Sequence, residues 1–260
     1  MFSVERQRRL LQHLRAEGSG NVLELAEVLG VSASTVRRDL KELDDRGLVT
    51  RVHGGASVIV ADLEPALSTR TTEHSEEKRR IARAAAARVP DNSTVLITGG
   101  TTTAAMLPHL AGRDGLTVLT NGLTIAYQLA RCPEISVVVL GGVLRHDEMS
   151  LLGPIAERVL ADFHVDVAFF SAFGIDPVAG LSAANVNEAG TDRRILQRAG
   201  SLVALMDSSK FGRRGPVRVA DIEQLQCLIT DDKAPADALA TIGAHGVEIA
   251  VCPVRQQDEI

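Results

Sequence analysis

One stretch near the start of the chain has the residue types and the spacing needed to contact nucleic acid. Hydroxyl side chains come first and cationic side chains follow within about two helical turns: Ser32, Ser34, Thr35, Arg37, Arg38 and Lys41. A hydroxyl can donate to a phosphate or to a base edge, and an arginine can form paired hydrogen bonds with guanine or with phosphate. The stretch therefore predicts contacts with DNA.

A second set of polar residues could hold a phosphorylated small molecule. The turn from Gly99 to Thr103 (GGTTT) combines glycines, which allow close approach of the backbone, with three hydroxyl donors. Further on, Lys210 offers a positive charge for an anion, and Asp207 can position that ammonium or accept from sugar hydroxyls. Each feature alone has an ordinary explanation. The GGTTT segment could be a plain strand-to-helix turn, and Asp207 with Lys210 could be a surface ion pair. Neither the Walker nor the Rossmann glycine pattern is present here.

Hydrophobic periodicity predicts three helices that position the first stretch. The first covers residues 4–14, the second covers residues 22–29 and ends at Gly30, and the third is capped by Ser32 or Ser34. Two short helices joined by a glycine-containing turn indicate a helix-turn-helix whose last helix reads DNA.

A predicted β-hairpin follows these helices. Residues 48–52 form its first strand and Gly54-Gly55 its turn, which makes the helix-turn-helix a winged one. Arg51 and His53 on this wing are further candidates for DNA contact. The predicted DNA-binding domain spans residues 1–57, and it carries nine Arg and Lys against eight Asp and Glu, whereas the remaining chain has a net charge of −6. The alternative is that the cations are only the solvated face of a surface helix.

From residue 93 onwards, short β-branched segments alternate with helix-length segments: TVLIT, LTVLT, ISVVVL, VDVAFF, LVALM, QCLIT and VEIAV. This alternation predicts a three-layer α/β domain, with a mostly parallel sheet covered by helices on both faces. Ligands of such sheets bind in the loops after the carboxyl ends of the strands. The candidate effector contacts are Gly99, Gly100, Thr101, Thr102, Thr103, Thr120, Asn121, Gly141, Gly142, Arg145, Gly174, Asp176, Glu188, Asp207 and Lys210.

The segment ELAEVLGVSASTVRRDLKELDDRGLVTRVHGGA closely resembles the DNA-binding domain of the DeoR family of bacterial transcription regulators. The later motifs Gly-Thr-Thr-Thr, Thr-Asn, Leu-Gly-Gly, Phe-Gly-Ile-Asp and Asp-x-Ser-Lys-Phe-Gly follow the order of that family's sensor domain. The resemblance implies a repressor of a carbohydrate-metabolism operon, whose operator affinity is modulated by a phosphorylated sugar. It also implies that Asp39 and Leu40 are structural.

For the C-terminal part, the resemblance implies a fold similar to ribose-5-phosphate isomerase, with the effector's phosphate near Thr101 to Thr103 and Lys210. We place the linker at residues 58–74 and the effector domain at residues 75–260. One position departs from the family, which usually has Asp where this chain has Thr98. The missing carboxylate puts the usual contact with a sugar hydroxyl in doubt, so the identity of the effector does not carry over.

Two other function classes compete with a ligand-switched regulator. A sugar-phosphate isomerase could use Glu188, Asp176 and Lys210 as acid, base and anion-stabilising groups. An enzyme has no need of a recognition helix, however, so we expect no catalytic residues. A purely architectural DNA binder would not need so large a second domain. Because one helix-turn-helix seldom reaches operator affinity, we expect a homodimer or homotetramer on double-stranded operator DNA.

Composition limits the remaining possibilities. No apolar run approaches the roughly 18 to 20 residues that cross a bilayer, and no secretory signal is visible, so we expect a cytoplasmic protein without a membrane partner. Cys132, Cys227 and Cys252 lack the spacing of a zinc site, so we expect buried free thiols, no metal and no cofactor besides the effector.

Overall fold

The chain divides into two compact units, Met1–Pro65 and Ala66–Ile260. The computed structural model describes residues 3–17, 19–45, 49–52, 54–58, 65 and 67–253. One cluster of buried apolar side chains lies in the N-terminal unit, and two further clusters lie in the C-terminal unit. Each unit therefore has a core of its own.

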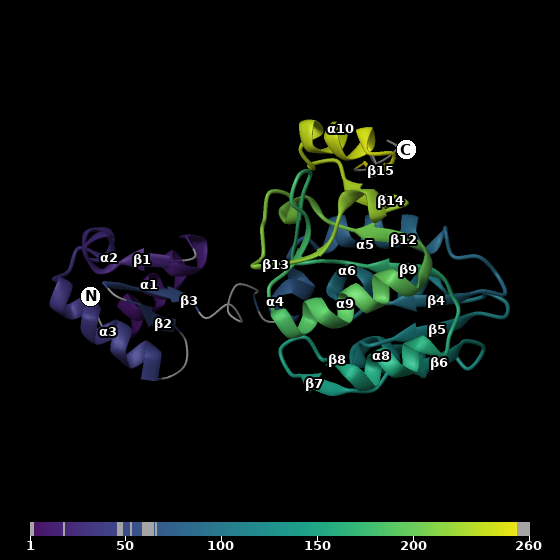
Figure 1. Cartoon of the computed structure of the whole chain (residues 1–260), viewed down its shortest axis with the longest axis horizontal. Helices are drawn as coiled ribbons and strands as arrows, with labels where there is room; N and C mark the ends of the chain where they lie inside the picture. The colour runs from purple at the N-terminus through teal and green to yellow at the C-terminus, as the bar shows by residue number, and fades with distance from the viewer. Residues whose placement is uncertain are drawn as a thin grey trace, which may run out of the picture. The chain divides into compact units, whose positions relative to one another are not determined.

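The N-terminal unit is a winged helix-turn-helix (Figure 1). Its described elements are α1 (Ser3–Glu17), β1 (Ser19–Asn21), α2 (Val22–Leu29), α3 (Ala33–Asp45), β2 (Val49–Val52) and β3 (Gly55–Val58). The three predicted helices are confirmed. Their apolar faces meet in one core, in which Leu10, Leu25 and Leu40 are at most 1% exposed.

Polar side chains determine where α2 and α3 begin. The Asn21 side chain accepts hydrogen bonds from the backbone N–H groups of Leu23 and Glu24, both at 3.0 Å, and so caps α2. Helix α2 ends at Gly30, whose φ of 64° is in the left-handed region that favours glycine. Ser32 then accepts from the N–H of Thr35 at 3.2 Å and begins α3. These local signals produce the tight turn between the two helices.

The predicted hairpin corresponds to β2 and β3, and the strand that the sequence analysis missed is β1. Strand β3 lies between β1 and β2 and is antiparallel to both. A side chain on Gly55 would place its Cβ 2.2 Å from the carbonyl oxygen of Gly20, so the β1–β3 pairing requires a glycine there. Gly54 lies in the turn, with a φ of 86°, and Gly55 begins β3. The predicted wing residue His53 and the side chain of Arg51 lie outside the described residues.

A single seven-stranded parallel sheet forms the centre of the C-terminal unit. Its strands are β4 (Thr94–Ile97), β5 (Thr117–Thr120), β6 (Ser136–Val139), β9 (Val165–Phe170), β12 (Ala199–Leu205), β14 (Cys227–Asp231) and β15 (Glu248–Cys252). They lie in the order β15-β14-β12-β9-β4-β5-β6, and all neighbours are parallel. Each strand coincides with one of the seven predicted segments, so the predicted parallel sheet is confirmed.

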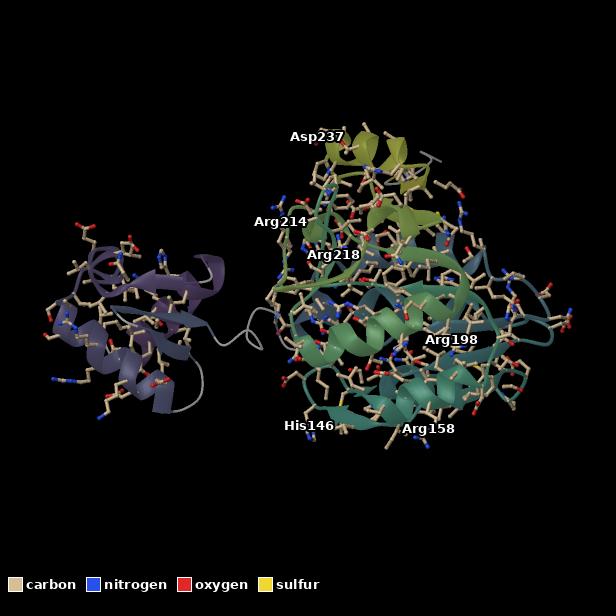
Figure 2. All side chains as sticks on the ribbon, viewed as in Figure 1. His146, Arg158, Arg198, Arg214, Arg218 and Asp237 are labelled. Atoms are coloured by element: carbon tan, nitrogen blue, oxygen red, sulfur yellow. The ribbon has the colours of Figure 1, made fainter. Side chains whose placement is uncertain are left out.

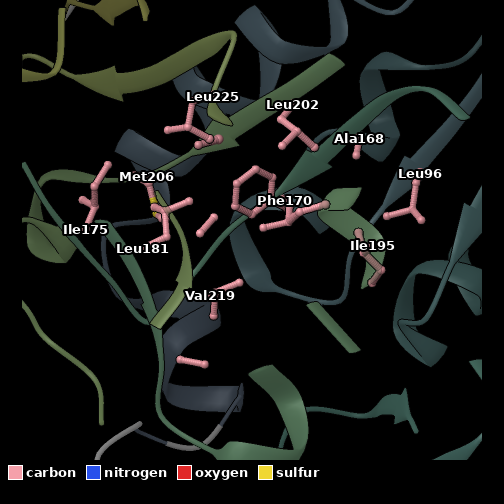
Figure 3. Packing of buried hydrophobic residues seen from close by; sticks show 14 of the residues in the cluster. Leu96, Ala168, Phe170, Ile175, Leu181, Ile195, Leu202, Met206, Val219 and Leu225 are labelled. Atoms are coloured by element: carbon pink, nitrogen blue, oxygen red, sulfur yellow. The ribbon is translucent and has the colours of Figure 1, made fainter. Parts of the chain in front are cut away.

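Helices cover both faces of this sheet, as Figure 1 shows. One face is covered by α5 (Ser75–Ala86), α6 (Thr101–Ala104), α7 (Leu123–Leu129) and the turn η2 (Leu107–His109). The other is covered by α8 (Pro154–Ala161), α9 (Val186–Arg198) and α10 (Ala236–Ala244). Successive strand residues serve opposite faces: Phe169 packs on the α5 side and Phe170 on the α9 side (Figure 3).

Smaller elements extend the carboxyl end of the sheet, and the sequence analysis did not predict them. They are the hairpin β7 (Val143–Arg145) and β8 (Ser150–Leu152), a sheet of β10 (Gly174–Asp176), β11 (Gly180–Ala183) and β13 (Val217–Ala220), and the turns η3 (Ser208–Lys210) and η4 (Ile222–Gln224). Helix α4 (Leu67–Thr72) lies inside the range predicted as linker, 58–74. A helix of six residues is too short to show a periodic pattern, and long-range bonds to the rest of the unit hold it.

The sheet core offers a direct test of the fold. Phe169 is fully buried at the centre of the sheet, so Phe169→Ala should destabilise the C-terminal unit by about 3 to 5 kcal/mol. Val178 is 87% exposed, and Val178→Ala should change stability by less than about 0.5 kcal/mol. Chemical denaturation followed by circular dichroism measures both. Equal stabilities of the two variants would contradict this packing.

Candidate functional sites

The exposed face of α3 is a cationic surface with no internal partners. Four residues of α3 share one helical face, because they are spaced three or four positions apart along the helix. Their side chains are exposed: Ser34, Arg37, Arg38 and Lys41. Among the described residues, the three cations form no ion pair and no hydrogen bond with another side chain. Free cations and a hydroxyl on one helical face are suited to phosphate and base contacts.

The opposite side of α3 is anchored to α1. Arg6 donates to both carboxylate oxygens of Asp39, at 2.5 and 2.9 Å, and Asp39 is 1% exposed. This hydrogen bond raises the pKa of Arg6. Gln7 also donates to Glu42, at 2.6 Å. Together with the buried Leu40, these bonds fix which face of α3 is presented to solvent.

The hydroxyl groups at the start of α3 have a second role besides any DNA contact. The Ser32 hydroxyl caps the helix and lies 2.9 Å from the hydroxyls of both Ser34 and Thr35. Ser32 and Ser34 are exposed, and Thr35 is half-buried. These hydroxyl groups therefore stabilise the first turn of α3, and they also lie within reach of a ligand at that amino-terminal end.

In the C-terminal unit, the strand order defines where a ligand can enter. The chain passes from β4 to β5 and β6 on one side, and returns to β9, β12, β14 and β15 on the other. The connections therefore diverge between β4 and β9, and ligands of such sheets bind outside the carboxyl ends of the strands at this point. The predicted turns after β4, β5, β9 and β12 all lie at this edge.

The turns after β4 and β5 pack directly on one another. The N–H of Gly99 donates to the side-chain oxygen of Asn121 at 2.8 Å, and the N–H of Gly122 donates to the Thr120 hydroxyl at 3.0 Å. A Cβ on Gly122 would lie 2.9 Å from the Cα of Gly99, so this approach requires glycine. The structure thus brings these predicted residues together and uses Thr120 and Asn121 to shape the turns.

The Gly-rich turn after β4 has fewer available hydroxyls than its sequence suggests. Helix α6 is a single turn of four residues, and the Thr103 hydroxyl donates to the carbonyl of Thr98 at 2.7 Å. Thr102 is buried and Thr101 is half-buried. The buried hydroxyl oxygen of Thr98 has no hydrogen-bond partner among the described residues. It lies beside the Gly-rich turn.

A cluster of buried charges lies at the same edge of the sheet. Asp207 and Lys210 follow β12, and three charged residues from other elements join them; the five members, at most 8% exposed, are Arg70, Lys78, Glu148, Asp207 and Lys210. Arg70 of α4 donates to Glu148, which lies between β7 and β8. We call these residues the charge cluster. The sequence analysis missed Arg70, Lys78 and Glu148 as site residues.

The charge cluster holds three cations and two carboxylates, and two further carboxylates border it: Glu73 acts on Lys78, and the fully buried Asp231 accepts from the N–H of Ser208 at 2.6 Å. Burial lowers the pKa of Lys78; the charges of Asp207 and Glu73 oppose this shift, and those of Lys210 and Arg70 reinforce it. One carboxylate oxygen of Asp207 accepts from Ser209, whereas the other, Oδ2, is buried without a hydrogen-bond partner among the described residues. A ligand that carries a hydroxyl donor would satisfy this oxygen.

Other predicted residues have separate partners at the rim. The Asp176 carboxylate accepts from the N–H groups of Val178 and Ala179 at 3.0 and 2.8 Å, and from Arg214 at 2.8 Å (Figure 2). Arg145 of β7 lies 2.8 Å from Glu188 of α9. These bonds hold Asp176 in the β10–β11 turn, and its effector contact stays a prediction.

The glycines predicted for the site shape the backbone around it. Gly141 and Gly142 have φ values of 72° and 120°, between β6 and β7. A Cβ on Gly142 would lie 2.5 Å from the carbonyl of Leu152, and one on Gly174 would lie 2.1 Å from the carbonyl of Arg213. These positions require glycine for close packing whether or not a ligand touches them.

Three negative findings apply to the described residues. None of their helices is both long and apolar enough to cross a membrane. They contain no group of three or more His, Cys, Asp or Glu side chains that could hold a metal ion. Cys132, Cys227 and Cys252 form no disulfide; Cys227 is buried, and the other two are half-buried, which corrects the expectation that all three are buried.

Comparison with known proteins gives matches to both units. Residues 6–61 match the family model of the DeoR-like helix-turn-helix domain, and residues 73–232 match that of the DeoR C terminal sensor domain. A putative aga operon transcriptional repressor of Escherichia coli O157:H7 is 31% identical over 94% of this chain and 92% of its own length. The HTH-type transcriptional regulator GolR of Listeria innocua is 34% identical over 90% of this chain and 92% of its own.

Solved structures align less completely. The alignment with ribose 5-phosphate isomerase A from Methanocaldococcus jannaschii covers 54% of this chain and 55% of the isomerase chain, with 18% sequence identity and a TM-score of 0.40.

The bonds of Asp176 predict a pH dependence of stability. The N–H of Ala179, followed by Arg214 and the N–H of Val178, lowers the pKa of this carboxyl below its ordinary value of 3.8, although burial opposes the shift. The stabilisation is therefore present above the ordinary value and is lost as the pH falls through the lowered one. Asp176→Asn should reduce Tm at pH 6, and this difference should shrink as the pH falls below 3.8 and through the lowered pKa of the carboxyl. The exposed Glu134→Gln is the control, and a pH-independent difference for Asp176→Asn would contradict the assignment.

Proposed function

Because the chain belongs to the DeoR family of transcription regulators, we propose that it represses a carbohydrate-metabolism operon and releases its operator when a phosphorylated sugar binds. The observation that carries the proposal is the charge cluster at the divergence of β4 and β9, with its three buried cations and the Oδ2 of Asp207, which has no hydrogen-bond partner among the described residues. The relatives' names agree with this control of sugar genes: one is an aga operon repressor, and another is the glycerol-3-phosphate regulon repressor of Escherichia coli.

The charge cluster favours an effector with two chemical features. A phosphate group can form charge-assisted hydrogen bonds with the buried cations Lys210, Lys78 and Arg70. A sugar hydroxyl provides the donor for Asp207, whose Oδ2 would otherwise remain buried and unpaired at a cost of about 1 to 3 kcal/mol. Thr98 can donate or accept but carries no charge, so phosphate and Asp207 dominate recognition.

Helix α3 is the element that reads the operator. Its exposed hydroxyl and cations face away from the core, and the bonds of Asp39 and Glu42 to α1 hold that face outward. Arginine can bond to phosphates or to the edge of guanine in the major groove. One such helix makes few base contacts, so we propose that a dimer or tetramer places two or more copies on repeated half-sites.

The chain acts as a sensor and not as an enzyme. An isomerase would require Glu188 and Asp176 as free acid and base groups, whereas Glu188 pairs with Arg145 and Asp176 is bonded to its own turn and to Arg214. The named relatives are transcription regulators. A regulator of this kind works where the chromosome is, which for a bacterial protein is the cytoplasm.

Loss of the cations on α3 should weaken operator binding. Arg37→Ala or Arg38→Ala should each reduce affinity by about 1 to 3 kcal/mol if that arginine reads a guanine. Fluorescence anisotropy with the intergenic DNA upstream of the gene, at one fixed salt concentration, measures the effect. Arg8→Ala is the matched control, because Arg8 is an exposed arginine of α1. Unchanged binding by both α3 variants would remove α3 as the reading helix.

Loss of Lys210 should affect the effector response and leave the DNA contacts in place. Lys210→Ala removes a buried cation from the proposed phosphate site, so the sugar-phosphate concentration that releases half of the operator should rise at least about tenfold, a loss of about 1.4 kcal/mol. The same anisotropy assay is titrated with glycerol 3-phosphate, ribose 5-phosphate and fructose 6-phosphate. Lys233→Ala is the control, since Lys233 pairs with Glu77. An identical titration curve for Lys210→Ala would exclude this residue from the site.

A further inference from the structure

Helix α4 connects two parts of the molecule that the proposed switch must couple. In the sequence it is the first described element of the C-terminal unit, which begins at Ala66, directly after the DNA-binding unit. In space it packs against α6, the single helical turn of the Gly-rich loop after β4. Helix α4 therefore contacts the candidate site and also stands at the start of the C-terminal unit in the chain.

Arg70 forms the first attachment of α4 to the effector site. It is buried and bonded to Glu148, which lies in the turn between β7 and β8. That turn is itself tied to the loop after β5: the N–H of Leu123 donates to the carbonyl of Met149 at 2.8 Å, and Ser150 forms a bridge with Gly122. Arg70 thus fixes α4 to the same loops that form the candidate site.

Lys78 forms the second attachment. Its ammonium donates to the carbonyl of Arg70, and to the carbonyl of Glu73 at 2.8 Å, so it holds the carboxyl-terminal end of α4. The same ammonium interacts electrostatically with Asp207 and Lys210. Because burial lowers the pKa of Lys78, its charge is poorly solvated, and a new anion nearby would compete strongly with the two carbonyl oxygens.

We propose that α4 transmits effector occupancy to the DNA-binding unit, with Lys78 and the Arg70–Glu148 pair as its two attachments to the site. This inference rests on the proposed function. In the ligand-free protein, Lys78 holds the end of α4. A phosphate bound at Lys210 draws the Lys78 ammonium toward itself and weakens the bonds to Arg70 and Glu73, so α4 shifts to a second arrangement in which the operator is bound less tightly.

Removal of the Lys78 ammonium should mimic the effector. Lys78→Met should bind the operator as weakly as the effector-saturated wild-type protein does, and saturating sugar phosphate should change its affinity by less than about twofold. Lys78→Arg keeps the charge and the donors, and should restore both tight binding and release. Lys233→Met, which removes a lysine that touches neither α4 nor the charge cluster, should behave as the wild-type protein does.

Hydrogen exchange of the full chain, with inorganic phosphate as the probe, tests the same idea without a known effector. In the wild-type protein, phosphate should slow exchange at residues 99–103 and speed it at residues 67–73. In Lys78→Met, exchange at residues 67–73 should already be fast and should not respond to phosphate, although residues 99–103 are still protected. Glu148→Gln weakens the other attachment of α4 and should also speed exchange at residues 67–73, which keeps the test open if Lys78→Met does not fold.

The outcomes separate the two hypotheses. If phosphate protects residues 99–103 in the wild-type protein but residues 67–73 respond equally in Lys78→Met, or respond in neither protein, the role of α4 is wrong and the effector site stands. If phosphate protects residues 99–103 in no protein, the proposed phosphate site is wrong, and the role of α4 falls with it. Wild-type operator binding and release by Lys78→Met would also overturn the inference.

Discussion

The burial of charged side chains at the carboxyl edge of the parallel sheet is the constraint on which the C-terminal unit depends. Arg70, Lys78 and Lys210 lose most of their hydration there, and the carboxylates of Glu148 and Asp207 are buried with them. Buried charges are tolerated only when hydrogen bonds and counter-charges offset the desolvation. The backbone carbonyls of Arg70 and Glu73 supply part of that offset, which is why a six-residue helix stays in place beside the site.

The two units differ in how their polar groups are satisfied. In the DNA-binding unit, the buried carboxylate of Asp39 is paired with Arg6, and the cations that remain without partners among the described residues are exposed on α3. In the C-terminal unit, polar atoms without partners, Oδ2 of Asp207 and the hydroxyl of Thr98, are buried instead. Exposed free cations suit a large, hydrated polyanion such as DNA, which binds largely through its phosphates. Buried unpaired acceptors suit a small ligand that brings its own donors into a site from which water is excluded.

Local patterns made much of this architecture predictable. Seven apolar, β-branched segments became seven strands because helices cover both faces of the sheet, which gives continuous apolar runs rather than alternating ones, even in the partly exposed edge strands β6 and β15. Gly30 and Ser32 marked the helix-turn-helix because capping depends on neighbouring residues alone. The roles of Arg70, Lys78 and Glu148 were not predictable from a single sequence, since 78 positions separate Arg70 from its partner Glu148. For the same reason the bond between Asp176 and Arg214, 38 positions apart, was not predictable.

Thr98 changes the charge balance of the site and therefore the kind of ligand it selects. The DeoR family usually has Asp at this position, and a carboxylate there would add a negative charge at the edge where the charge cluster lies. With Thr98 that charge is missing, while a hydroxyl without a partner among the described residues remains beside the Gly-rich turn. In the site that we propose, Asp207 accepts from a sugar hydroxyl and the buried cations bind the phosphate. A neutral sugar would bond to Asp207 and leave those cations without a ligand contact, so we expect selectivity to rest on the phosphate group.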